Sequence, residues 1–301
     1  MINKNSKVIV IDWGTTNFRA FLLDSNNELI SETAANIGLL SINDGNFARA
    51  LASILEKWQP DYKAMPIIMA GMVGSAKGWH NVDYVNCPMS AGDLCHSLFN
   101  FQLPWGPEAL IVPGVSYTSS IGKDVMRGEE IQIFGLASLL KAHQFEAVFP
   151  GTHSKHVVFE QGQILSFATY MTGELFSILD KHSILASEKA DKHEFSSTAF
   201  YRGINDAQDG QLTHRLFLAR THMLFAQIQE SEVADYISGM LIGHELQSKV
   251  GQKVAIVGSE HLNERYLLAC KHMNIQATAY DGNDCFVAGV KEIVLNCRES
   301  S

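Results

Sequence analysis

The chain has 301 residues, of which 46% are hydrophobic and 18% charged, a composition typical of globular proteins with enough apolar material for two domains. Its 32 acidic residues outnumber its 23 basic ones, and the formal net charge of −9 leaves no basic stripe for a nucleic-acid backbone, so we expect no nucleic-acid partner. No run approaches the ~20 apolar residues that cross a bilayer and no signal-peptide core stands at the start, so we expect a cytoplasmic protein without membrane contact.

The first part of the chain reads as three strands followed by a helix. An apolar run over 8–11 (VIVI) is typical of a buried strand, and the polar turn 12–17 separates it from a second strand over 18–23. A third strand is predicted over 28–34 and an amphipathic helix over 45–58, whose start is signalled by Asn43 and Asp44.

The second half repeats this order. A strand over 147–149 leads into the turn 150–155, and strands over 156–160 and 164–171 precede a helix that begins at 172. The match is a weak internal duplication, in which Gly14-Thr15-Thr16 and Gly151-Thr152-His153 occupy the same first hairpin turn. We therefore predict two related α/β domains, over 1–140 and 141–301, with the two turns facing each other across an interdomain cleft.

The paired turns have the residue types that hold phosphate. Glycine lets backbone N–H groups approach an anion, and hydroxyl side chains and Lys155 add donors and a positive charge. The candidate phosphate-binding residues are Gly14, Thr15, Thr16 and Asn17 in the first turn and Gly151, Thr152, His153, Ser154 and Lys155 in the second. Ordinary polar hairpin turns are the alternative for either turn alone, but their occurrence in register in both halves favours a clamp for a triphosphate.

Several other chemistries have no motif here. The sequence lacks the P-loop, the dinucleotide fingerprint, the G-x-S-x-G elbow and H-E-x-x-H. Its five cysteines are odd in number and form no C-x-x-C, which indicates reduced thiols rather than disulfides or zinc. His153 and His156 do not share one face of a strand, so we do not interpret them as a metal pair.

Five segments in order resemble a known family, 2-dehydro-3-deoxygalactonokinase, within the superfamily of sugar kinases, actin and heat-shock ATPases. They are IDWGTTN (11–17), GMVGS (71–75) with Gly78 and Trp79, DVMRGEE (124–130), PGTHSK (150–155) and MTGELF (171–176). Lys77 departs from the family pattern, where an arginine is expected. The resemblance implies two ribonuclease-H-like domains, ATP as the phosphoryl donor, and the terminal hydroxyl of 2-keto-3-deoxygalactonate as the acceptor in galactonate and galactose breakdown. It also implies adenosine binding near Gly239, Gly258 and Ser259, within a helix over 234–247 and a strand-helix unit over 254–272.

Three carboxylates are the catalytic candidates. Asp12 ends a buried strand, and we expect it to orient Mg²⁺ through water, with the cap of its own turn as the alternative. A phosphoryl transfer also needs a carboxylate to receive the proton of the attacking hydroxyl. Glu129 and Asp124 remain two open candidates for that base, near a helix predicted over 129–142. The alternative is that such first-turn carboxylates only stabilise the helix dipole.

The substrate site is expected around the loop that follows the strand 67–69. Its candidate residues are Met72, Ser75, Lys77 and Trp79, together with Arg127 and Arg19 as cations, and Arg127 is preferred because arginine binds a carboxylate with a planar fork. Trp79 and Tyr84 could instead be core residues. A last helix over about 285–297 should pack back on the first domain. A kinase for another sugar acid or sugar, and a non-kinase actin-like ATPase, are the alternative functions, and a homodimer is left open.

Overall fold

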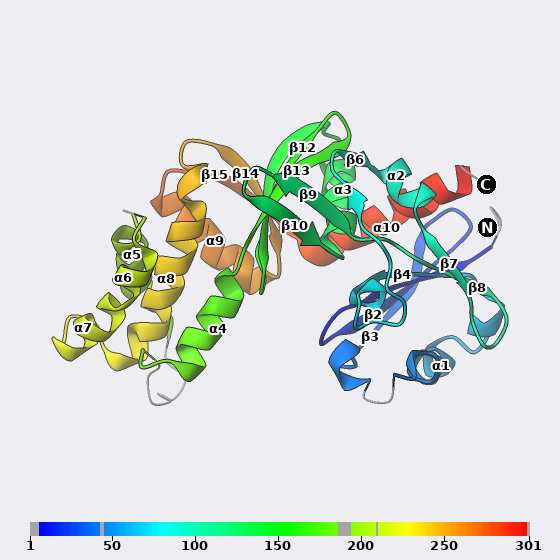
Figure 1. Ribbon diagram of the computed structural model, residues 1–301, viewed down its shortest axis with the longest axis horizontal. Helices are drawn as coiled ribbons and strands as arrows, with labels where there is room; N and C mark the ends of the chain where they lie inside the picture. Colours follow the sequence, from blue (N-terminus) through cyan, green and yellow to red (C-terminus); the bar gives the residue numbers. More distant parts are fainter. Residues whose placement is uncertain (1–5, 43–44, 186–193, 209, 300–301) are drawn as a thin grey trace. The chain divides into compact units, whose positions relative to one another are not determined.

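The computed structural model of the chain describes residues 6–42, 45–185, 194–208 and 210–299 (Figure 1). Two compact units can be recognised within it. The first consists of Met1–Gln144, Val158–Phe167 and Gly282–Ser301, and the second of Phe145–Val157 and Ala168–Asp281. The chain therefore leaves the first unit and returns to it twice.

A six-stranded sheet with the order β3-β2-β1-β4-β8-β7 forms the centre of the first unit. Its strands are β1 (Val8–Trp13), β2 (Phe18–Leu23), β3 (Leu29–Ala35), β4 (Ile67–Gly71), β7 (Phe99–Gln102) and β8 (Glu108–Ile111). β1 pairs with β2 antiparallel and with β4 parallel. β1 is buried along nearly its whole length, which explains why its sequence is a continuous apolar run rather than an alternating one.

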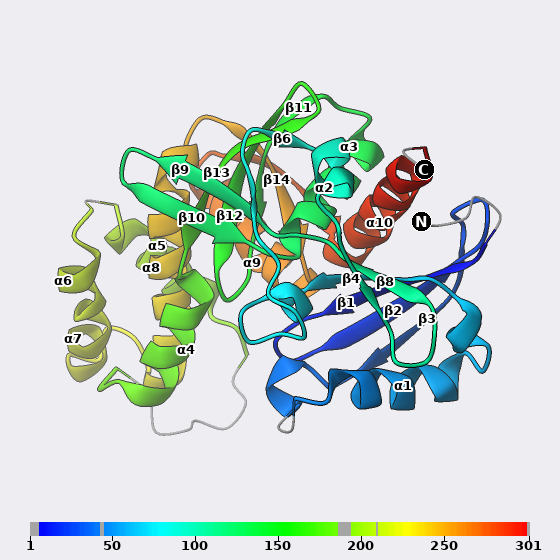
Figure 2. The same cartoon turned by 45° about the vertical axis from the view of Figure 1, so that its right-hand side comes forward.

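Helices cover both faces of this sheet (Figure 2). On one face, α1 (Phe47–Trp58) inserts Leu51 and Leu55 into a core cluster with β1. On the other, α3 (Glu129–Leu140) and α10 (Gly282–Glu299) place apolar side chains against the sheet, with Ile131 and Val290 lining one apolar gap together with Val10 of β1. Successive side chains of β1 point to opposite faces of the sheet, so the strand contributes to an apolar core on each face.

The start of α1 differs from the prediction. Asn46 is the N-cap, and its side chain accepts a hydrogen bond from the backbone N–H of Arg49 at 3.0 Å. Asn43 and Asp44, which signalled the start in the sequence, lie outside the described residues.

The remaining elements of the first unit are short. They are β5 (Val85–Asn86), β6 (Met89–Ser90), α2 (Ala91–His96), β9 (Val115–Ser119) and β10 (Gly122–Met126). β10, β9 and β5 form a three-stranded sheet in that order, and β9 and β10 pair antiparallel. This hairpin carries Asp124 and leads directly to Arg127 and the start of α3.

A second six-stranded sheet has the order β15-β14-β11-β12-β13-β6. Its other strands are β11 (Gln144–Phe149), β12 (Ser154–Glu160), β13 (Gln163–Tyr170), β14 (Lys253–Gly258) and β15 (Gln276–Asp281). The helices of the second unit are α4 (Thr172–His182), α5 (Ser197–Asp206), α6 (Leu212–Leu216), α7 (Leu218–Leu224), α8 (Val233–Leu246) and α9 (Glu260–His272).

Two apolar clusters stabilise the second unit. One joins β14 to α8 and α9, with Ile256, Leu246 and Tyr266 among its buried members. The other is helical and centres on Tyr236 and Met240 of α8. α5 and α8 approach closely because both carry glycine at the crossing: a Cβ on Gly239 would lie 2.0 Å from the backbone oxygen of Phe200.

Most predicted elements are present within one to three residues of their expected ends, including the strand-turn-strand order in both halves. α10 packs on α3 in the same unit as the first sheet, and a Cβ on Gly135 of α3 would collide with the backbone of Cys285 in α10. The domain bounds 1–140 and 141–301 stay a prediction. None of the helices within the described residues combines the length and apolarity needed to cross a membrane.

Candidate active site

The first candidate phosphate turn is a tight loop between β1 and β2. The Gly14 N–H donates to the Asn17 carbonyl at 2.9 Å, and Thr15, Thr16 and Asn17 are exposed. A neighbouring segment braces the turn, because the Leu39 N–H donates to the Gly14 carbonyl at 3.0 Å. The turn therefore presents its backbone and its hydroxyl groups to solvent from a rigid support.

Gly38 makes that support possible. A Cβ at Gly38 would lie 2.3 Å from the backbone of Thr15 and Thr16, a separation that no side chain can adopt without moving the turn. The close approach of two backbones here requires glycine.

Asp12 forms an ion pair with Arg19 across the β1–β2 ladder. Arg19 Nη2 lies 2.5 Å from Asp12 Oδ2 and Arg19 Nε lies 3.2 Å from the same oxygen. Arg19 also donates to the side chain of Asn283 in α10 and lies over the ring of Phe286. Arg19 is thus engaged with groups of the first unit, and the other carboxylate oxygen of Asp12, Oδ1, lies next to Gly71.

Two glycines bring the start of α3 close to Asp12. Gly71 ends β4 with a φ of +84°, and a Cβ on it would lie 3.1 Å from Asp12 Oδ1. A Cβ on Gly128, which has a φ of +115°, would in turn lie 3.6 Å from the Gly71 Cα. Because Glu129 follows Gly128, the structure brings this candidate base into the neighbourhood of Asp12.

The carboxylates at the start of α3 have different environments. Glu129 is half-buried and accepts from the Arg127 N–H at 3.2 Å. Glu130 is fully buried, and its Oε2 accepts from the Gly128 N–H at 2.7 Å. Burial, with the nearby Glu129 adding to it, raises the pKa of Glu130 to about 8. Asp124, the other candidate base, lies on β10, and its Oδ1 accepts from the Val125 N–H at 2.7 Å.

Arg127 is buried beneath the candidate substrate loop. Its Nη2 donates to the Val82 carbonyl at 2.7 Å, and its guanidinium lies 4.4 Å from the centroid of the Tyr84 ring. Its Nε and Nη1 have no hydrogen-bond partner within the part of the chain that the structure describes. Nη1 lies against Gly74, where a Cβ would be only 2.7 Å away.

The predicted substrate residues in the loop after β4 differ in how deeply they are buried. Ser75 is buried with a hydroxyl that has no partner among the described residues, whereas Lys77 is exposed. Trp79 and Met72 are half-buried and pack against the core cluster of the first unit, with Trp79 stacked on Phe47 at 6.1 Å between centroids. This packing agrees with the core interpretation of Trp79, while Tyr84 remains 41% exposed.

The second candidate turn is built on the first turn of α4. The Glu174 N–H donates to the Thr152 carbonyl at 3.0 Å, and His153 Nε2 lies 2.5 Å from Glu174 Oε2. A Cβ on Gly173 would lie 2.4 Å from the Gly151 carbonyl oxygen, so this helix start must carry glycine. At Gly151 itself, by contrast, a Cβ would meet no atom of the described residues within 4 Å. One side of the turn is therefore closely packed and the other is open.

The last two residues of the predicted turn, Ser154 and Lys155, already belong to β12 and are buried. Ser154 is fully buried and its hydroxyl donates to Glu245 Oε1 at 2.7 Å. Lys155 is also buried, and its Nζ lies 3.4 Å from the His153 carbonyl oxygen. Ser154 therefore directs its hydroxyl away from solvent.

The three predicted adenosine residues occupy two places in the second unit. Gly258 ends β14 and Ser259 is the N-cap of α9, and a Cβ on Gly258 would lie 3.7 Å from the Pro150 ring. This pair is therefore next to the start of the second turn. Gly239 lies instead at the α5–α8 crossing, where helix packing accounts for the absence of a side chain.

A family model described as 2-keto-3-deoxy-galactonokinase matches residues 12–293, a span that includes both turns. The chain belongs to this family. A 2-dehydro-3-deoxygalactonokinase of Escherichia coli (strain K12) is 32% identical to it over 295 residues, covering 96% of this chain and 97% of the relative. A solved structure from Sinorhizobium meliloti, provisionally assigned as a 2-dehydro-3-deoxygalactonokinase, is 28% identical with a TM-score of 0.88 and covers 97% of this chain and 99% of that one.

A more distant structure supports the fold alone. Component A of the (R)-2-hydroxyglutaryl-CoA dehydratase of Acidaminococcus fermentans has a TM-score of 0.50 at 10% identity, covering 97% of this chain and 99% of that one. The predicted α/β fold of the actin-like ATPase class is confirmed. The predicted family is confirmed as well, and with it an ATP-dependent carbohydrate kinase that acts on a small sugar-type molecule.

Sequence reasoning about this galactonokinase family member missed four residues of the site. Gly38 and Gly173 allow the close backbone contacts behind the two turns. Glu245 is a buried carboxylate that accepts from Ser154 of the second turn, and Glu130 is a buried carboxylate that accepts from Gly128 at the start of α3. A signal for Glu245 was available: it is a charged residue that follows the apolar stretch Met240–Ile242 of α8. The two glycines gave no local signal, because their partners are distant in sequence or belong to another element.

Proposed function

We propose that this chain transfers the γ-phosphoryl group of ATP to the terminal hydroxyl of 2-keto-3-deoxygalactonate, in galactonate and galactose breakdown. The observation that carries the proposal is the family match from residue 12 to residue 293, which is supported by a curated relative of nearly the same length that bears this activity as its name. We place the reaction in the cytoplasm, where ATP is available, and leave a homodimer as the assembly to be tested.

In the first unit, the backbone N–H groups and hydroxyls of the exposed turn Gly14–Asn17 would bind phosphate oxygens. In the second unit, Gly151, Thr152 and His153 would also bind phosphate oxygens, because the open side of Gly151 lets an anion approach the backbone. Ser154 would contribute through its backbone, since its hydroxyl is committed to Glu245. Gly258 and Ser259 are the proposed contacts of the nucleoside, and Gly239 has a packing role.

The residues present fit a magnesium ion that is held mainly by phosphate and water. No group of three or more His, Cys, Asp or Glu side chains that could hold a metal occurs among the described residues, and Asp12 offers one carboxylate at the edge of the first turn. Magnesium typically binds through one or two carboxylates together with water and substrate phosphates. Bound there, it would neutralise charge on the transferring phosphoryl group. Asp12, fixed by Arg19, would orient the ion through water.

We propose Glu129 rather than Asp124 as the base. Glu129 follows Gly128, whose backbone adjoins Gly71 and, through it, Asp12. In the reaction, the terminal hydroxyl oxygen of the substrate attacks the γ-phosphorus, its proton passes to the Glu129 carboxylate, and ADP leaves with the electrons of the broken P–O bond. Asp124 instead lies on the β9–β10 hairpin.

The substrate carboxylate is best matched by Arg127. Two of its guanidinium nitrogens have no partner among the described residues and could donate hydrogen bonds to a carboxylate. The hydroxyl of Ser75, which also lacks a partner there and follows Gly74 at the guanidinium, adds another donor. Lys77 would supply a second cation from the exposed part of the loop. Arg19 is engaged with Asp12, and Met72 and Trp79 pack on the core, so these three would shape the site rather than bind the carboxylate.

The test is a coupled assay of ADP release from Mg-ATP with a panel of sugar acids and neutral sugars. We expect turnover with 2-keto-3-deoxygalactonate well above that with neutral hexoses. A neutral hexose has no carboxylate, so its binding would leave the buried Arg127 cation without a partner. The Arg127→Lys variant should raise KM for the sugar acid and leave KM for ATP unchanged. Equal rates with glucose or galactose would refute the substrate, and another sugar acid as the best acceptor would reassign it.

A further inference from the structure

A buried carboxylate stands behind the second turn. Glu245, near the end of α8, is 1% exposed and accepts hydrogen bonds from four side chains. The Ser154 hydroxyl and His156 Nε2 lie 2.7 and 2.9 Å from its Oε1, and the Tyr266 hydroxyl lies 2.8 Å from its Oε2. The fourth donor, the Thr172 hydroxyl, also contacts Oε2.

Burying an ionised carboxylate costs free energy unless hydrogen-bond donors replace its lost contacts with water. An ionised carboxylate taken from water loses solvation worth several kcal/mol, and only multiple well-placed donors restore it. A leucine or methionine at this position would suit the mostly buried α8 without that cost. A role beyond packing would explain a carboxylate with four donors from three separate elements, β12, α4 and α9.

The donors show which segments Glu245 connects. Ser154 is the first residue of β12, directly after Gly151, Thr152 and His153, and Thr172 is the first residue of α4. The next two residues of α4 contact the turn itself, through Gly173 against Gly151 and the Glu174 N–H on the Thr152 carbonyl. One carboxylate therefore holds both the chain that leaves the turn and the helix start that supports it.

We propose that Glu245 is a positioning residue for ATP binding: by fixing Ser154 and Thr172, it holds residues 151–153 in the conformation that presents their backbone N–H groups to the phosphates. This inference rests on the proposed function only in that the second turn binds ATP. Glu245 itself, being buried, acts through the turn and not on the nucleotide.

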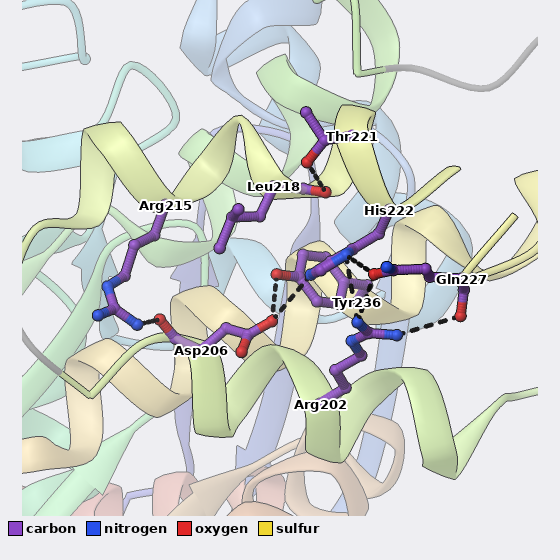
Figure 3. A network of polar contacts seen from close by, with 8 residues as sticks. All are labelled: Arg202, Asp206, Arg215, Leu218, Thr221, His222, Gln227 and Tyr236. Carbon is purple, nitrogen blue, oxygen red and sulfur yellow. Dashed lines mark hydrogen bonds and ion pairs between the residues drawn. The ribbon is translucent and has the colours of Figure 1, made fainter. Parts of the chain in front are cut away.

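A second polar network of the same unit provides a matched control (Figure 3). The carboxylate of Asp206 accepts from the Tyr236 hydroxyl at 2.7 Å and lies 3.2 Å from His222 Nε2. Arg202 and Gln227 extend this network, and all of its members come from α5 to α8 and their connections. Asp206→Asn therefore weakens a comparable network that belongs to the helices rather than to the turn.

The experiment measures the Kd of Mg-AMPPNP by calorimetry, and Tm by circular dichroism, for the wild type, Glu245→Gln and Asp206→Asn. Gln has the size of Glu, but its NH₂ group would face one of the donors. We expect both variants to lower Tm, and only Glu245→Gln to weaken nucleotide binding, by roughly tenfold to a hundredfold, as expected for displaced binding groups. Equal Kd values in the folded Glu245→Gln protein and the wild type would overturn the proposal.

Two milder variants, both at Thr172, test the same proposal if Glu245→Gln does not fold. Thr172→Val keeps the shape of the side chain and removes the hydroxyl, whereas Thr172→Ser retains the hydroxyl. We expect weaker binding in the first and affinity near the wild-type value in the second, and equal affinities in both would overturn the proposal. Because the readout is nucleotide binding, a wild type that binds AMPPNP but does not phosphorylate the sugar acid would contradict the proposed function alone.

Discussion

Replacing Glu130 by glutamine tests how deeply the start of α3 is buried. The Glu130 side chain is fully buried, its Oε2 accepts from the Gly128 N–H at 2.7 Å, and its Oε1 has no partner among the described residues. Glutamine keeps the acceptor for Gly128 and cannot ionise. The variant therefore resembles the protonated glutamic acid at every pH.

The size and sign of the effect follow from the pKa. Burial raises the pKa of Glu130 from 4.5 to about 8. Each pKa unit corresponds to about 1.4 kcal/mol, so ionisation costs the native state roughly 5 kcal/mol at most. The folded protein retains a proton that the unfolded chain has lost between these two values. This contribution to stability is thus fully present below pH 4.5 and is lost as the pH rises towards 8.

The assay is urea unfolding of the wild type and Glu130→Gln at intervals from pH 5 to pH 9. We expect the stability of the variant relative to the wild type to increase by several kcal/mol over this range. Glu56→Gln, on the exposed side of α1, removes a carboxylate without burial and serves as the control. If the curves of Glu130→Gln and the wild type run parallel from pH 5 to pH 9, Glu130 ionises normally and the argument from burial is wrong.

Three further predictions concern the turns and a thiol. Asp12→Asn should lower kcat by roughly a hundredfold with only a small change in Tm, since an ion pair that keeps contact with solvent contributes little to stability. Near-normal kcat at ordinary magnesium concentration would leave Asp12 a turn residue. Gly151→Val should fold normally, because a Cβ there meets no atom within 4 Å in the part of the chain that the structure describes, yet it should lose nucleotide binding in calorimetry. Unchanged affinity would show that this turn does not bind phosphate. Burial raises the pKa of Cys87 to about 12, so iodoacetamide at pH 8 should modify it far more slowly in the folded than in the unfolded protein, and equal rates would contradict that burial.

Local patterns in the sequence were enough to predict the strands and the two turns. The VIVI run of β1 and the polar residues after it specify a buried strand and a hairpin because side-chain burial and turn chemistry act over a few residues. The same holds for α3, which begins at Glu129 as predicted and ends at Leu140, where Lys141 has a φ of +50°. The short elements between β4 and α3 carry weaker patterns and were not predicted.

The environment of each candidate residue depended on contacts between distant segments. Gly38 supports the turn at Thr15, and Glu245 reaches Ser154 across 91 residues of sequence. The sequence offered Arg127 and Arg19 as cations, with Arg127 preferred, but it did not show their surroundings. The structure pairs Arg19 with Asp12 and buries Arg127 with two nitrogens that have no partner among the described residues. The sequence by itself therefore determined the elements, the two turns and the family resemblance, since these depend on near neighbours and motif order. Only the tertiary structure decided which side chains support the turns and which remain available to a ligand, because burial and hydrogen bonding are set by packing.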